Sequence, residues 1–277
     1  MMTGAVVEWR SVEVDRGRLD VLELGTDGGV PVLLIGTALT SDELVPVGRQ
    51  LAAETGRRVL AVRRRGYGSS GPMHAPGSVA ADAADCVALM DALGVERAAV
   101  VGVSYSAAVA LQLASSWPAR VERVAAIEPP PLQAASAAEF RGSCADLVAE
   151  HKEHGAERAA DRFLSRLVDP NWRLDLERIV PGTASRVETD AEAFYTADLP
   201  ALLTWDFGPA HAALVRAPVL LVSGEASEPW FEEEIETIRA WFPTASVVGV
   251  PLADHSMAFT HPGVIAAVLA DFMHEAT

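Results

Sequence analysis

One stretch, Ala98–Ala114, constrains the fold of this chain more than any other, because it predicts a strand that turns abruptly into a helix. The apolar run that opens it is typical of a buried strand, and the alanine-rich run that closes it is typical of a helix. Ser104 lies at the bend, with the small residues Gly102 and Ser106 on either side. Small residues at this spacing let the backbone fold sharply and hold the serine hydroxyl outward. Ser104 is therefore a candidate nucleophile, and a helix N-cap is the structural alternative.

Composition and charge limit the classes of partner. The chain has 277 residues, of which 50% are hydrophobic, enough for one large core or a core with a lid. Its 22 Lys and Arg against 38 Asp and Glu give a formal net charge of -16. Because such a charge repels polyanions, we expect no nucleic-acid partner.

Nothing in the sequence predicts a membrane segment. The first residues lack a basic region followed by an apolar core, and no later apolar run is long enough to span a bilayer. We therefore expect a cytoplasmic protein without a membrane partner. Cys86 and Cys144 lack the paired spacing of a metal or redox site and are expected to pack in helices. The richness in Ala, Val and Arg is typical of high-GC bacterial proteins.

Strand and helix patterns alternate along most of the chain. Helical patterns cover Ser41–Thr55, Ser78–Leu93 and Pro262–His274, between short apolar runs bounded by Gly and Pro. This alternation predicts an α/β fold with a mostly parallel sheet that helices cover on both faces. Besides the strand before Ser104, the predicted strands are Val6–Val14, Leu19–Leu24, Pro31–Ile35, Arg58–Val62, Val121–Ile127, Val219–Val222 and Ala245–Val250.

One long segment breaks this alternation. Residues 132–215 show helical patterns and no strand pattern, so we expect a helical insertion after the sixth strand. Such an insertion lies where it can cap a crevice at the carboxyl ends of the strands, and an accessory bundle is the alternative. The core is then made of residues 1–131 and 216–277. The helical tracts predicted in the insertion are Ala134–His154, Ala156–Val168, Ser185–Asp198 and Pro200–Leu214.

Four segments in this order resemble the α/β-hydrolase superfamily. They are the strand end Pro31–Thr37, the glycine-rich loop Arg64–Gly71, the Gly-Val-Ser-Tyr-Ser bend and the pair Asp254-His255. The resemblance implies the α/β-hydrolase fold, a hydrolytic activity, and a histidine at position 255 that acts with the serine. A serine hydroxyl is a weak nucleophile, so a nearby imidazole must take its proton during attack and return it to the leaving group.

A carboxylate must hold this imidazole in the productive tautomer. The family usually has an aspartate after the strand before the last, but this chain has Ser227 there. Glu228 is offset by one residue, and Glu128 ends the strand Val121–Ile127. A charge between an apolar strand and three prolines favours a buried partner, so Glu128 is our first choice. This placement resembles that in certain haloalkane dehalogenases and in lactonases similar to zearalenone hydrolase.

The backbone N–H of Tyr105, the residue after the nucleophile, is an expected donor to a developing oxyanion. The second donor is expected from Thr37, with Ala38 as the alternative. Aromatic residues of the insertion could line an apolar pocket, or pack only between helices. The candidate pocket residues are Ala38, Trp172, Tyr195 and Trp205.

The run Arg63–Arg65 is expected to pair with carboxylates, and a subsite for an anionic substrate is the alternative. Taken together, these residues predict a serine hydrolase that cleaves a small-molecule ester or lactone through an acyl-enzyme, without a metal or cofactor. Carbon–carbon bond hydrolysis, perhydrolysis and a catalytically weak binding protein on this fold stay open, as does the oligomeric state.

Overall fold

A computed structural model describes residues 8–74, 76–168 and 170–274. Within these residues lies an eight-stranded sheet in the order β1-β2-β4-β3-β5-β6-β7-β8, parallel from β4 to β8. The predicted fold class is confirmed, with strand ends that differ by a few residues; residues 6 and 7 of the strand predicted from Val6 lie outside the described ranges. The strands are β1 Arg10–Val14, β2 Gly17–Leu24, β3 Val32–Ile35, β4 Val59–Arg63, β5 Ala98–Val103, β6 Val121–Ile127, β7 Val219–Gly224 and β8 Ser246–Val250.

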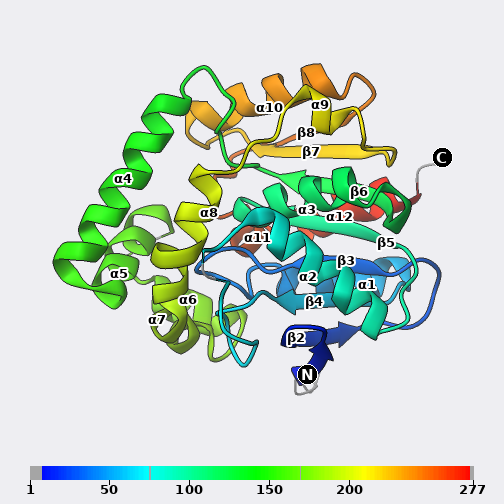
Figure 1. Cartoon of the computed structure of the whole chain (residues 1–277), viewed down its shortest axis with the longest axis horizontal. Coiled ribbons are helices and arrows are strands. Elements are labelled where there is room, and N and C mark those ends of the chain that lie inside the picture. The colour runs from blue at the N-terminus through cyan, green and yellow to red at the C-terminus, as the bar shows by residue number, and fades with distance from the viewer. Residues whose placement is uncertain (1–7, 75, 169, 275–277) are drawn as a thin grey trace.

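Helices cover both faces of the sheet (Figure 1). Helices α1 and α12 pack together on one face, and α2 and α3 pack together on the other. No helix in the described part of the chain is long and apolar enough to cross a membrane. The helices of these layers are α1 Val45–Thr55, α2 Val79–Ala92, α3 Tyr105–Ser116, α10 Pro229–Trp241, α11 Met257–Thr260 and α12 Pro262–His274.

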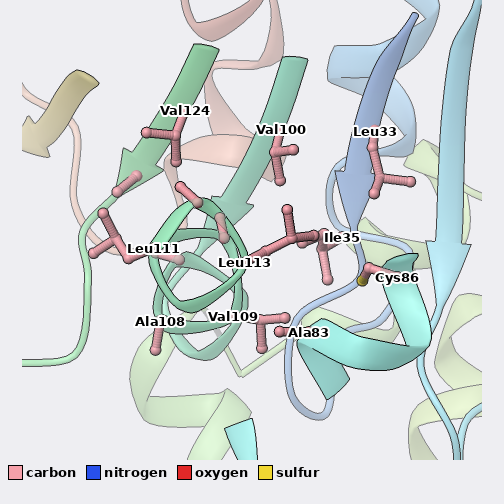
Figure 2. Packing of buried hydrophobic residues seen from close by; sticks show 14 of the residues in the cluster. Leu33, Ile35, Ala83, Cys86, Val100, Ala108, Val109, Leu111, Leu113 and Val124 are labelled. Carbon is pink, nitrogen blue, oxygen red and sulfur yellow. The ribbon is translucent and has the colours of Figure 1, made fainter. Parts of the chain in front are cut away.

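The central strands are buried on both sides, which explains their continuous apolar sequence. Leu33 and Ile35 of β3 face the layer of α2 and α3, whereas Val32 and Leu34 face that of α1 and α12. Figure 2 shows Leu33 and Ile35 packing, with the strand residue Val100, against side chains of α2 and α3. Small side chains on α3 let this helix lie close to the sheet, which fixes the position of its first residue.

Between β6 and β7 the chain forms a group of helices, α4 to α9, which we call the inserted helices. Figure 1 shows most of them gathered at one end of the sheet. Many of their apolar residues form a separate buried cluster that includes Leu164, Trp172 and Phe194. Their bounds are α4 Ala137–His154, α5 Ala156–Leu167, α6 Trp172–Ile179, α7 Thr183–Ala193, a π-helical segment Phe194–Asp198, α8 Leu199–Leu203 and α9 Pro209–Ala212.

The inserted helices differ from the prediction in two respects. Helix α6 has no counterpart in the predicted tracts, and the tract Pro200–Leu214 is divided into α8 and α9. The division lies before Gly208, which has extended backbone, and Pro209, which begins the new helix. Trp205 and Phe207 between these two helices pack in the main core beside α3, so the insertion ends against the sheet's own helical layer.

Candidate active site

The parallel strands bring four predicted site residues and Ser227 to one edge of the sheet. Thr37 follows β3, Ser104 follows β5, Glu128 follows β6, Ser227 follows β7 and His255 follows β8. Because β3, β5, β6, β7 and β8 are consecutive neighbours, their carboxyl ends meet along this edge. A cavity of about 320 Å³ lies here, enclosed on its other side by inserted helices. All of these positions except Glu128 line it.

Ser104 occupies a strained turn between β5 and α3. Its φ of 53° lies in the left-handed region, which non-glycine residues rarely adopt. A Cβ on Gly102 would lie 2.0 Å from the Ser106 carbonyl oxygen, so only glycine allows this close approach. The buried Ser106 hydroxyl donates to the Val103 carbonyl and lies 2.9 Å from both backbone polar atoms of that residue. Serine at the fifth position of the motif therefore stabilises the turn.

Glu128 and His255 form the closest polar contact at this edge. Glu128 Oε2 lies 2.5 Å from His255 Nδ1, and Glu128 Oε1 accepts a 2.8 Å hydrogen bond from the Gly224 N–H. The Glu128 side chain is fully buried, and its φ of 42° marks a second strained residue at the edge. Both carboxylate oxygens are thus held, one by the end of β7 and one by the imidazole.

The surroundings of His255 favour its charged form. Burial lowers the pKa of His255, but the hydrogen bond and charge of Glu128, with the charge of Glu43, outweigh burial and raise this pKa above its usual value. The Phe231 ring stacks on the imidazole at a centroid distance of 4.3 Å and fixes its plane. Ser104 and His255 line the same cavity, and no hydrogen bond joins them within the described residues. Such bonds are often long in unliganded enzymes and tighten with substrate.

The backbone amide of Tyr105 and those of the loop after β3 are available as donors at the cavity. Tyr105 is the first residue of α3, so its N–H has no acceptor within the helix. The Thr37 hydroxyl donates to the Val103 carbonyl at 2.8 Å, which holds the loop after β3 beside the serine turn. Among the described residues, no backbone carbonyl accepts from the Thr37 or Ala38 amide. Thr37, Ala38 and Tyr105 all line the cavity.

The alternative acid, Glu228, is placed differently from Glu128. It is exposed at the start of α10 and lines the cavity without a hydrogen bond to His255. Ser227 stands where the family usually has its aspartate, and its buried hydroxyl has no hydrogen-bond partner. Of the two candidate carboxylates, the structure brings Glu128 to the imidazole.

Three of the four predicted pocket residues do not line the cavity; only Ala38 does. Trp172 is fully buried between inserted helices, and its indole N–H donates to Asp161. Tyr195 stacks on an imidazole of α4, and Trp205 stacks on Phe207 beside the main core. The aromatic residues that do line the cavity are Tyr105, Phe140, Phe163, Phe194, Trp230, Phe231 and Phe259.

Sequence reasoning missed Glu43, a buried acid of the cavity wall. Its carboxylate accepts a 2.8 Å hydrogen bond from the Thr40 hydroxyl, and only 6% of the residue is exposed. Burial raises the pKa of Glu43 to about 7, although the charge of His255 and the Thr40 hydrogen bond act in the opposite direction. The prediction of a helix from Ser41 placed Glu43 inside that helix. In the structure α1 begins only at Val45, so Glu43 precedes the helix.

The arginine run is a set of buried ion pairs, as the structural interpretation predicted. The Arg63 guanidinium forms a bidentate pair with Asp42, and that of Arg65 forms one with Asp85. Arg64 bonds both Asp82 and Asp198. The guanidinium groups of this run are therefore neutralised within the protein.

His74, Asp82 and Asp85 are the one group of described residues with ligand atoms close enough together to hold a metal, within 4.8 Å of one another. However, Asp82 already binds the Arg64 guanidinium and Asp85 that of Arg65. Two buried positive charges disfavour a cation at this place. We assign no metal to it.

Comparisons with known proteins agree with this architecture. The structure of a thermophilic esterase from Thermogutta terrifontis matches with a TM-score of 0.75 and 20% identity, over 96% of this chain and 98% of that one. The enol-lactonase from Burkholderia xenovorans matches with a TM-score of 0.75 and 21% identity, over 96% and 100% of the two chains. An α/β hydrolase from Sphaerobacter thermophilus matches with a TM-score of 0.72 and 26% identity, over 95% and 100%.

These matches share the sheet and its covering helices with the present structure. The sequence model of the alpha/beta hydrolase family, in addition, matches residues 32–268, which include every strand from β3 onward. That range spans the serine turn, the glutamate after β6 and the histidine after β8. The chain therefore belongs to the alpha/beta hydrolase family.

Proposed function

We propose that this protein is a serine hydrolase that cleaves a carboxylic ester or a lactone through an acyl-enzyme. Ser104 is the nucleophile, His255 the general base and acid, and Glu128 the residue that orients the imidazole. The observation that carries the proposal is the 2.5 Å contact between Glu128 Oε2 and His255 Nδ1, beside a cavity that both His255 and the strained Ser104 line. With Nδ1 held by the carboxylate, Nε2 is left for the serine and the substrate.

In the first half of the reaction, Ser104 Oγ attacks the carbonyl carbon and His255 Nε2 takes the hydroxyl proton. The Tyr105 and Thr37 amides donate to the resulting oxyanion, and the imidazolium then gives its proton to the leaving alkoxide oxygen. Water attacks the acyl-enzyme by the same route in reverse and releases the acid. Glu128 stabilises the imidazolium, which agrees with the raised pKa of His255.

The cavity favours an uncharged, largely apolar substrate of modest size. Seven aromatic residues line its wall, and its volume of about 320 Å³ suits a small molecule. The acids of the wall are Glu43, Asp198, Glu228 and Asp254, and its arginine is Arg166. We infer that the inserted helices act as a cap that sets the acyl and alcohol groups accepted. The names of the similar structures, an esterase and an enol-lactonase, support this substrate class.

Hydrolysis of p-nitrophenyl esters and a panel of lactones tests the proposal. We expect Glu128→Gln to lower kcat by about 10³ to 10⁴-fold, because the amide cannot stabilise the imidazolium. The matched variant Glu228→Gln should change kcat less than about threefold, since that side chain is exposed and not bonded to His255. The reverse ranking would refute the assignment of the acid. If the protein instead hydrolyses a carbon–carbon bond or uses peroxide and does not hydrolyse esters, the same residues catalyse that other reaction.

A further inference from the structure

Asp198 is a buried carboxylate of the inserted helices whose contacts lie on the core of the protein. It ends the π-helical segment before α8, is 3% exposed and lines the cavity. Its two oxygens accept hydrogen bonds from Nη1 and Nη2 of Arg64, each at 2.8 Å. Asp198 Oδ2 also accepts from the Tyr67 hydroxyl at 2.5 Å. One carboxylate therefore holds two side chains of the loop after β4.

Each of these two side chains holds one end of the loop after β3. Arg64 Nε donates to the Gly36 carbonyl at 2.9 Å, and the Tyr67 hydroxyl accepts from the Leu39 N–H at 2.9 Å. Gly36 and Leu39 flank Thr37 and Ala38, which line the cavity. Leu39 has a φ of 62°, a conformation that a leucine keeps only where its surroundings impose it. Asp198 thus reaches both ends of this loop through one intervening side chain each.

The same network reaches Tyr105, the other proposed oxyanion donor. Arg64 Nη1 donates to Asp82 Oδ2 at 2.9 Å, and that oxygen accepts from the Tyr105 hydroxyl at 2.8 Å. The Arg64 guanidinium also lies 4.2 Å from the centroid of the Tyr105 ring. Arg64 therefore contacts the loop after β3, the residue after the serine, and the inserted helices.

We propose that Asp198 is a positioning residue that couples the inserted helices to the oxyanion hole. When the helices are seated, Asp198 fixes Arg64 and Tyr67, and these hold the Thr37 and Tyr105 amides where the oxyanion forms. Oxyanion stabilisation requires donors that are fixed before the charge develops, and a displacement of about 1 Å can cost about 10²-fold in rate. The inference rests on the proposed function, because it concerns the oxyanion of that reaction.

Two variants interrupt the network at different points. Tyr67→Phe removes the hydroxyl between Asp198 and the Leu39 N–H and leaves the ion pair with Arg64. Asp198→Asn keeps the size of the side chain but removes its charge, which leaves Arg64 with Asp82 alone. Asp190→Asn is the matched control: Asp190 is a buried carboxylate of α7 that accepts a 2.7 Å hydrogen bond from the Gly68 N–H, and it has no bond to residues 36–39.

The measurement is kcat for a p-nitrophenyl ester per active serine, with active serines counted by fluorophosphonate labelling. A trifluoromethyl ketone supplies the second readout, because Ser104 adds to its carbonyl carbon and leaves an oxyanion in the hole. We expect Tyr67→Phe and Asp198→Asn to lower kcat per active serine by about 10-fold to 10²-fold. The inhibition constant of the ketone should rise in proportion, with KM changed less than about threefold. Asp190→Asn should leave all three quantities at their wild-type values.

The outcomes separate the inference from the proposed function. If Tyr67→Phe and Asp198→Asn only reduce the number of active serines, with kcat per serine and the ketone constant unchanged, Asp198 has a structural role and the inference is wrong. An equal loss of kcat per active serine in Asp190→Asn would overturn the inference too. It would mean that the loss of any contact between the inserted helices and the core lowers kcat. A wild-type chain that neither turns over esters nor takes up the fluorophosphonate would instead refute the proposed function.

Discussion

The pKa of Glu43 tests whether the cavity wall shields this carboxyl from water. Burial raises the pKa of its carboxyl from 4.5 to about 7, so the folded chain holds this proton more tightly than the unfolded chain does. A group of this kind contributes stability that is complete below about pH 4.5 and is lost as the pH rises through about 7. A shift of this size corresponds to about 3 kcal/mol in the free energy of unfolding. Most of that loss falls between about pH 5 and pH 8.

Urea unfolding of the wild type and Glu43→Gln across this pH range measures the effect. We expect the difference in unfolding free energy between the two proteins to change by about 3 kcal/mol, with the wild type losing stability relative to the variant as the pH rises. Each protein keeps Glu234, another buried acid whose pKa burial raises to about 7. Because the charge of Glu43 helps to raise the pKa of His255, the difference between the two proteins reports Glu43 together with its interaction with His255.

The exposed glutamate Glu54 of α1 is the control, and Glu54→Gln should run parallel to the wild type within about 0.5 kcal/mol. Parallel curves for the wild type and Glu43→Gln would refute the reasoning. They would mean that water or a cation reaches the Glu43 carboxyl and keeps its pKa near the ordinary value.

Two further predictions concern packing. Gly102→Ala should destabilise the chain by about 3 kcal/mol or more in thermal or urea unfolding, because the new methyl group meets the Ser106 carbonyl. Gly142→Ala, in an exposed turn of α4 with open space around it, should instead stabilise the chain by up to about 1 kcal/mol, and equal effects would contradict the packing argument. Burial raises the pKa of Cys144 to about 11 and that of Cys86 further, so iodoacetamide at about pH 8 should label neither thiol before unfolding, as mass spectrometry would show.

The sheet could be predicted from the sequence because its signals are local. Apolar runs bounded by Gly and Pro mark the strands, and the Gly-Val-Ser-Tyr-Ser bend marks one sharp turn. The contact between Glu128 and His255 could also be anticipated, since a charge that follows the apolar run Val124–Ile127 requires a buried partner. The topology then supplies the geometry: β6 and β8 lie on either side of β7, and their ends meet.

The cavity wall could not be predicted in the same way, because it depends on how helices pack on one another. Trp172 and Tyr195 were predicted as pocket residues because they are aromatic residues of the insertion. In the structure their rings instead pack in the buried cluster between the inserted helices. Phe231 was not predicted as a site residue. It precedes a run of glutamates in α10, a helix that was not among the predicted elements. Glu43 was missed since its role depends on the exact residue at which α1 begins.

The central claim is that Ser104 is an activated nucleophile. The most direct measurement treats the wild type and Ser104→Ala with a fluorophosphonate, which phosphonylates an activated serine with loss of fluoride, and weighs both proteins by intact mass spectrometry. The account predicts a single adduct on the wild type and none on Ser104→Ala. An unmodified wild type, or the same adduct on both proteins, would contradict it.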